Sequence, residues 1–437
     1  MKEDNLLDFY TNTDFEHLLK AGHGRAYLIA REDPERYKDK ILSICRNDYT
    51  FDMQSEGSRA FLTADLIRLF EDQTPFIEAA KESIKDSEEY VQIQYLSDLL
   101  MEFGMRKDIV EKYISIWEKI EETPYEKLKE RGYPLLEDVE YLAIKLICGA
   151  SWKTADNIIK DMGRWYLQTG DRKGCSFMWF YSCLEDEFGE EETEEHVISL
   201  SKTSPEADAF YRHDVLRDWA PRITEDEIPT APEIVSIFEE GKELRGLDIL
   251  HMGIHKMPDE EKEKLAQMAV DTDNIRLRTQ IVSLYITERM VWPLEISYLL
   301  SWCDEGDEDL RSSCEEALTL FESPGIREYA LRTENVPLLI CNYKSQDEEL
   351  LMDLLMKIEI DDNDDNDWHH IRMLITDKDL PDRFLCWVYE TTLCSFCREC
   401  VVSDLIERGT FPERYREECM WDADLDIRAL IEGGKDH

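Results

Sequence analysis

The sequence predicts an all-α protein, and three observations support this fold class. Apolar residues recur every three or four positions along most of the chain, which is the period of an amphipathic helix. The alternation of apolar and polar residues that is typical of a half-buried strand is hard to find. Prolines stand where helices are expected to begin, because the first helical turn needs no amide donor; they are Pro34, Pro75, Pro232, Pro381 and Pro412.

Two N-terminal segments carry start and stop signals for helices. Thr13 followed by Glu16 forms a capping box before the segment FEHLLKAG, and Gly22 is placed to end that helix. The segment EYVQIQYLSDLLMEFG repeats apolar residues at helical spacing and stops at Gly104. We therefore expect each segment to form a helix that ends at its glycine.

A short motif recurs along the chain. Arg25-Ala26-Tyr27-Leu28 and Arg59-Ala60-Phe61-Leu62 begin 34 residues apart, which is the length of one helical hairpin. Similar pairs of an apolar residue and an arginine stand near later helix starts, at Arg276, Arg311, Arg327 and Arg428, with Ile371-Arg372 as a further candidate.

These segments resemble the HEAT-like family of helical repeats, in which a helix start of the form Asp-x-x-apolar-Arg recurs once per hairpin. The resemblance is best for 270–437 and weaker for 14–84, and the words CSFCRE and EGSRAF are similar to those of uncharacterised bacterial members. The sequence departs from the pattern in spacing, since Arg311 and Arg327 are only 16 residues apart. The resemblance implies stacked helical hairpins that form a curved α-solenoid.

Stacking has a physical reason, because one helix pair cannot bury its apolar stripe alone and neighbouring pairs share a continuous core. We expect an arginine near the first turn to reach an acid on the adjacent repeat. Asp273, Asp309 and Asp424 lie just before such arginines and are expected to cap the same helices. The arginines are therefore interpreted as structural rather than catalytic.

The chain of 437 residues is longer than one ordinary core, so two units are expected. The segment APRITEDEIPTAPE (220–233), with three prolines and an acidic run, is the preferred boundary. We predict an N-terminal helical array over 1–220 and a C-terminal HEAT-like array over 221–437. Further breaks are expected within 122–138 and 186–195.

Charge restricts the partners. The sequence contains 98 acidic and 51 basic residues, for a formal net charge of −47. Free nucleic acid and an anionic membrane surface are unsuitable partners, because both would repel such a chain. The acidity has two interpretations: a solvated surface that maintains solubility, or a concave acidic face that attracts a basic protein partner.

The cysteines indicate the compartment. Twelve cysteines stand at irregular spacings, and neither a signal-peptide pattern nor an apolar run of membrane-spanning length is recognised. We expect reduced thiols in the cytoplasm, each acting as a small hydrophobic residue.

The run TTLCSFCRECVVSDLIERG (391–409) offers a candidate metal site at Cys394, Cys397 and Cys400. On a helix these residues span a rise of ~9 Å, whereas zinc needs its sulfur ligands within ~4 Å of each other. A site formed by Cys394 and Cys397 alone would need help from Cys386 or Cys419.

A packed helix face explains the same run better. We expect a buried stripe of Cys394, Cys397, Val401 and Leu405, flanked by Phe396 and Cys400, with Arg398 and Glu399 facing water, Thr392 as the N-cap and Gly409 as the stop.

Other candidate sites are weaker. The acidic run DDNDDNDWHHIR (361–372) lacks the glycine and glutamate of a calcium loop, with Asn366 and Arg372 in their places. His251 and His255 have metal-compatible spacing, but the protease motif needs a glutamate where Met252 stands. The aromatic-rich segments 164–174 and 174–189 are interpreted as core. We therefore assign no catalytic residue, cofactor or metal ligand.

The expected function is a non-catalytic protein–protein interaction module, such as a scaffold, adaptor or inhibitor, whose acidic concave surface binds a basic or mixed protein surface. Two enzymatic alternatives remain open. One is a DNA-repair-type enzyme on a helical-repeat scaffold, and the other is a metal-dependent hydrolase that uses acids and histidines of 361–370. The sequence leaves the oligomeric state open.

Overall fold

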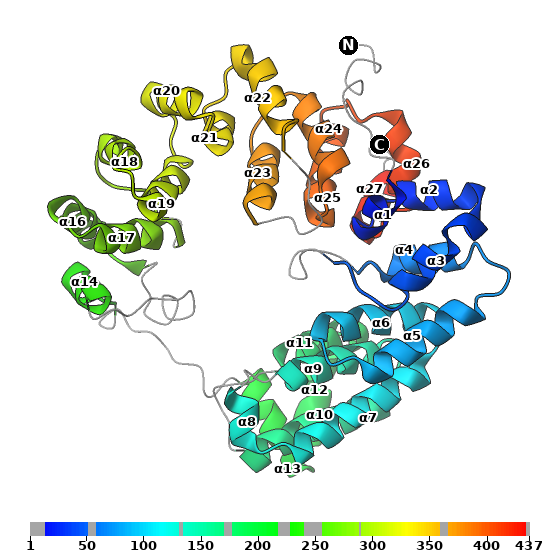
Figure 1. Ribbon diagram of the computed structural model, residues 1–437. Coiled ribbons are helices and arrows are strands. Elements are labelled where there is room, and N and C mark those ends of the chain that lie inside the picture. Colours follow the sequence, from blue (N-terminus) through cyan, green and yellow to red (C-terminus); the bar gives the residue numbers. More distant parts are fainter. Residues whose placement is uncertain are drawn as a thin grey trace. The chain divides into compact units, whose positions relative to one another are not determined.

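Regular structure in the computed structural model is helical, as the spacing of apolar residues predicts (Figure 1). The structure describes residues 14–50, 58–130, 134–169, 177–216, 228–239, 256–287, 290–358 and 366–433. No strand occurs in these ranges, so the all-α prediction is confirmed for them. None of the helices described there is long and apolar enough to cross a membrane.

The chain divides into two compact units. The first contains Met1–Ala220 together with Cys386–His437, and the second contains Pro221–Leu385. A division after residue 220 was expected, but the C-terminal segment was expected to continue the second array. It instead packs with the N-terminal helices, because buried ion pairs and ring contacts join them.

The first unit begins with short helices and continues with longer ones. Its helices are α1 (Phe15–Lys20), α2 (Arg25–Glu32), α3 (Pro34–Ile44), α4 (Ala60–Ile67), α5 (Thr74–Asp86), α6 (Tyr90–Glu102), α7 (Arg106–Glu122), α8 (Tyr125–Glu130), α9 (Pro134–Ile147), α10 (Trp152–Thr169), α11 (Met178–Phe188), α12 (Glu190–Ser201), α13 (Pro205–Phe210), the π-helical turn η2 (Tyr211–Val215), α25 (Ser395–Glu407), α26 (Glu413–Cys419) and α27 (Leu425–Gly433). Helix α24 (Asp382–Thr391) contains the division between the units.

The N-terminal and C-terminal helices meet in the first unit, where α26 packs against α2 and against α27 (Figure 1). The Arg25 guanidinium donates to the carboxylates of Glu390 and Glu418 at 2.7 and 2.8 Å. Tyr27 stacks on Trp421 with ring centroids 3.7 Å apart. The ion pairs of Arg25 are buried and Trp421 is partly buried, and both sets of contacts join residues more than 360 positions apart in the sequence.

The second unit is built from helices that pack in successive pairs. They are α14 (Ala231–Glu239), α16 (Asp259–Asp271), α17 (Ile275–Thr287), α18 (Ile296–Cys303), α19 (Glu308–Leu318), α20 (Pro324–Thr333), α21 (Val336–Cys341), the 3₁₀ turn η5 (Ser345–Asp347), α22 (Glu348–Leu355) and α23 (Asn366–Asp377). Within pairs, α16 packs on α17, α18 on α19 and α20 on α21. Between pairs, α17 contacts α19, α19 contacts α21, and α21 contacts α23.

The predicted glycine stops are confirmed. Gly22, Gly104 and Gly409 have φ values of +66°, +70° and +68°, a conformation that suits glycine and ends a helix. The amide after each glycine donates to a carbonyl five residues earlier; these pairs are His23 to Leu18, Met105 to Leu100 and Thr410 to Leu405. At the start of α1, Asp14 accepts from the Glu16 amide as the N-cap, and Thr13 lies outside the described residues.

The arginine motif is structural at Arg327 and Arg428 as well as at Arg25, whose ion pairs are described above. Arg327 on α20 pairs with Asp347 before α22, and Arg428 on α27 pairs with Asp65 on α4 at 2.8 Å. On α17 the buried arginine is Arg278, which pairs with Glu305 at 2.7 Å, while the predicted Arg276 is exposed.

The predicted caps differ in two of three cases. Asp424 caps α27 by accepting from the Asp426 amide at 2.9 Å, as expected. Helix α19 is capped by Asp307 rather than Asp309, because α19 begins one residue before Asp309. Asn274, not Asp273, accepts from the Leu277 amide at the start of α17.

Candidate functional site

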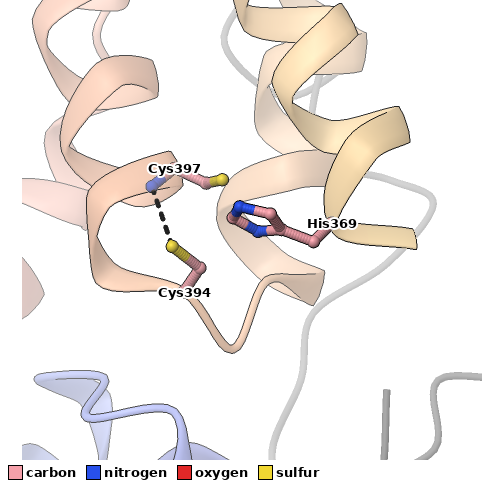
Figure 2. A group of neighbouring side chains, drawn as sticks. All are labelled: His369, Cys394 and Cys397. Carbon is pink, nitrogen blue, oxygen red and sulfur yellow. Dashed lines mark hydrogen bonds between the residues drawn. The ribbon is translucent and has the colours of Figure 1, made fainter. Parts of the chain in front are cut away.

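The cysteine run lies at the start of α25 in the first unit. Cys394 precedes the helix as its N-cap, and its Sγ accepts from the Cys397 amide at 3.5 Å (Figure 2). The predicted N-cap Thr392 lies two residues before Cys394, and its hydroxyl accepts from the Cys394 amide at 3.1 Å. His369, also drawn in Figure 2, belongs to the second unit.

The packed helix face is confirmed for Cys397, Val401 and Leu405, which are all buried. The prediction that Arg398 faces water is wrong, because its side chain is fully buried. Its guanidinium donates to both carboxylate oxygens of Asp422, at 2.8 and 2.9 Å, and to the Ala21 carbonyl at 3.0 Å. Arg398, which the helical pattern predicts to face solvent, thus joins α25 to the segments that contain Asp422 and Ala21.

The remaining sequence candidates have different outcomes. The predicted histidine pair, His251 and His255, and residues 361–365 of the predicted acidic loop lie outside the described residues. In the aromatic segment, Phe177 and Phe180 are buried as expected, whereas Trp179 is 65% exposed.

Two carboxylates next to that segment accept hydrogen bonds from amides at the start of α11. Asp214, on the π-helical turn η2, accepts from the Tyr166 hydroxyl at 2.8 Å and from the Phe177 amide at 2.9 Å. Glu140 on α9 accepts from the Trp179 and Phe180 amides, both at 3.0 Å. Burial, and then the charge of Asp214, raise the pKa of Glu140 to about 7. Both carboxylates fix the start of α11, which is a structural role.

The second unit has two adjoining cavities on either side of α19, and we call them together the α19 groove. The first cavity, between α17 and α19, has a volume of about 780 Å³. It is lined by Phe238, Ile275, Arg276, Thr279, Gln280, Ser283, Leu284, Thr287, Asp307, Asp309, Ser312, Ser313 and Glu316. Ser283 and Ser313 both line this cavity, and their hydroxyl oxygens lie 3.0 Å apart.

The second cavity lies between α19, the start of α21 and α23, and its volume is about 690 Å³. It is lined by Ser312, Glu315, Glu316, Thr319, Glu334, Asn335, Val336, Pro337, His369, His370, Ile371 and Met373. Ser312 and Glu316 line both cavities, so the two hollows adjoin along α19.

The charge of the groove is negative. Its acids are Asp307, Asp309, Glu315, Glu316 and Glu334. Among the described lining residues, Arg276 is the single lysine or arginine. Glu334 has a φ of 55°, a left-handed conformation that is uncommon for a residue with a side chain.

Another cavity of about 780 Å³ in the second unit has mixed charge and serves as a contrast. Arg327, Lys344 and Lys378 line it together with acids that include Glu322 and Glu328. Arg327 is already paired with Asp347. This cavity therefore lacks the predominantly negative charge of the α19 groove.

The chemistry of the groove favours cations that carry an apolar stem. Val336, Pro337 and Met373 offer apolar contact beside Glu315 and Glu334 in the second cavity. Lysine and arginine have such stems and charged ends. Sequence reasoning missed this site, because Ser312 and Glu316 are ordinary helix-surface residues until the packing of α17, α19 and α21 places a hollow on each side of them.

A scan against family models, a search of curated proteins and a search of solved structures found no match to this chain. What the groove can bind is therefore inferred from its own shape and charge.

Proposed function

We propose that this protein is a non-catalytic protein-binding module whose α19 groove binds a basic surface of a protein partner. In this proposal the helix pairs of the second unit are repeats of a curved, HEAT-like α-solenoid. Pairs that pack successively, as α16–α17, α18–α19 and α20–α21 do, support the repeat interpretation.

One observation carries the proposal: the two adjoining cavities are lined by five carboxylates and a single arginine. Opposite charge on the partner would speed its association and favour it over acidic proteins. A net charge of −47 also supports a basic protein as the partner rather than a nucleic acid, because the chain would repel the phosphates of a nucleic acid.

The proposal includes a reducing compartment, the cytoplasm. Burial raises the pKa of Cys45 to about 12 and that of Cys341 to about 11. Both thiols would stay protonated near neutral pH and would act as packing residues rather than nucleophiles.

The test compares two variants of equal charge. The groove variant carries Glu315→Gln, Glu316→Gln and Glu334→Gln, and the outer variant carries Glu260→Gln, Glu263→Gln and Asp353→Asn, at exposed positions of α16 and α22. Binding of a fluorescent lysine-rich peptide is measured by anisotropy. We expect the groove variant to lose roughly tenfold or more in affinity, as a loss of about 1.4 kcal/mol would give. Equal weakening of both variants would contradict a role for the groove.

A further inference from the structure

We propose that Cys394 and Cys397, in the first unit, form a binding site for a soft monovalent metal ion, Cu⁺, held between two thiolates. The site is separate from the proposed function, because both residues lie outside the unit that contains the α19 groove. The positions of the two sulfur atoms, their burial and a buried cation beside them support it.

The start of α25 brings the two sulfur atoms together (Figure 2). Cys394 is the N-cap and has an extended backbone, whereas Cys397 lies in the first helical turn. Their sulfur atoms lie within 4.8 Å of each other, and the Cys394 Sγ accepts from the Cys397 amide at 3.5 Å. The long helical rise that excludes a site of three cysteines therefore applies to Cys400, whose sulfur is not within 4.8 Å of both others.

Two converging thiolates match the coordination that Cu⁺ accepts, because this ion prefers soft sulfur ligands and is satisfied by two of them in a line. With metal–sulfur bonds of ~2.3 Å, the value for zinc, one ion fits between sulfur atoms up to ~4.6 Å apart. Zinc sites need three or four protein ligands, and iron–sulfur clusters need four. In the described part of the first unit, no third histidine, cysteine or carboxylate lies within 4.8 Å of both sulfur atoms.

Burial suits a bound metal ion better than it suits a reactive thiol. Cys394 and Cys397 are 0% and 1% exposed, and neither is in a disulfide. Binding breaks two S–H bonds, forms two Cu–S bonds and releases two protons to solvent, so no electron is transferred. The two thiolate charges and the single charge of Cu⁺ leave one net negative charge at the site.

A buried arginine lies beside the site and balances that charge. The Arg59 side chain is buried, and its Nη2 donates to the Leu393 carbonyl at 2.7 Å, directly before the first cysteine. Burying a charge is costly unless an opposite charge or hydrogen bonds compensate for it. Arg398, directly after the second cysteine, is paired with Asp422, so this pair adds no net charge. Arg59 therefore provides the positive charge that a buried pair of thiolates around Cu⁺ needs.

The experiment uses the full-length protein, prepared without metal under reducing and oxygen-free conditions, and titrated with Cu⁺ against the chromophoric chelator bicinchoninate. We expect the wild type to withhold one Cu⁺ per chain from a chelator excess that strips isolated thiols. Cys394→Ser and Cys397→Ser should each lower the affinity roughly hundredfold or more, since loss of an outer partner alone typically costs about 10- to 100-fold. Cys400→Ser, on the same helix, is the matched control and should bind as the wild type does. The affinity should rise with pH, because binding releases protons.

X-ray absorption at the copper edge tests the ligands on the wild type, and therefore does not depend on the folding of any variant. We expect two sulfur neighbours around the copper. A copper shell without two sulfur neighbours would overturn the site, as would unchanged affinity in both serine variants with wild-type circular dichroism. An equal loss of affinity in Cys400→Ser would overturn the assignment of the ligand pair. Retention of zinc in preference to Cu⁺ would overturn the choice of a monovalent ion.

Discussion

At the scale of single residues, the buried ion pair between Arg398 and Asp422 is the clearest case in which a charged side chain stabilises the fold. Both side chains are fully buried, and the two guanidinium–carboxylate contacts are 2.8 and 2.9 Å long. Removing one partner leaves the other charge buried without compensation, which costs much more than the loss of an exposed pair.

Asp422→Asn is therefore expected to lower the free energy of unfolding by about 3–5 kcal/mol, measured by chemical denaturation. The matched control is Glu417→Gln, which breaks the exposed pair with Arg31, whose side chain is 48% exposed. That change should cost less than about 1 kcal/mol. Similar small losses in both variants would show that the buried pair does not stabilise the first unit.

Asp138 gives a prediction about pH. This side chain is 1% exposed, and burial raises its pKa to about 7 although the charge of Lys112 opposes the shift. In the unfolded chain the same group titrates near pH ~3.9. Between about pH 5 and 7 the native carboxyl holds a proton that the unfolded chain lacks, so stability falls as pH rises through that window.

Asp138→Asn should remove this dependence, since an amide does not titrate. Relative to the variant, the wild type is expected to lose stability with rising pH by up to about 1.4 kcal/mol per pH unit below pH 7, and to change little above it. Denaturation at several pH values measures the difference, and Glu137→Gln at the exposed neighbouring position is the control. If the difference in free energy of unfolding between the wild type and Asp138→Asn stays the same from pH 5 to pH 7, the Asp138 carboxyl is not protonated in the folded protein as proposed.

At the scale of helices, the packing of α10 against α13 depends on one glycine. A Cβ atom added to Gly163 would lie 1.8 Å from the backbone carbonyl oxygen of Glu206, which is far inside van der Waals contact. Glycine inside a helix is normally replaced by alanine with a gain of about 1 kcal/mol. The close approach of the two backbones reverses that expectation here.

Gly163→Ala is expected to lower the midpoint of thermal unfolding, with a loss of about 1–3 kcal/mol from overpacking. Gly325→Ala in α20 is the matched change, because the nearest atom, Leu300 Cδ1, would be 3.5 Å away. That variant should be neutral or slightly more stable. If both variants gain stability, α10 and α13 do not approach as closely as described.

The sequence predicted where helices begin and end better than it predicted which helices and side chains pack against one another. Glycine stops such as Gly104 depend on local backbone conformation and could be recognised from neighbouring residues. The burial of Arg398 could not be foreseen, because its acceptors Asp422 and the Ala21 carbonyl lie 24 and 377 residues away. The groove was missed for the same reason, since its two cavities exist only once α17, α19 and α21 are packed.

At the scale of the whole molecule, charge is the dominant feature. A formal charge of −47 makes any cation bind to some extent, so weak binding of a basic peptide alone would say little. Exposed charges more than about 10 Å apart are screened at 0.1 M salt, whereas charges converging on one hollow act together at short range. Site-specific binding is therefore distinguished by which carboxylates control its salt dependence.

The most direct measurement is the affinity of the lysine-rich peptide for the wild type, the groove variant and the outer variant across a range of potassium chloride concentrations. We expect a steep decline in affinity with salt for the wild type and the outer variant. We expect a clearly shallower decline for the groove variant, because fewer ion pairs form there. The same slope for all three proteins would contradict binding in the α19 groove.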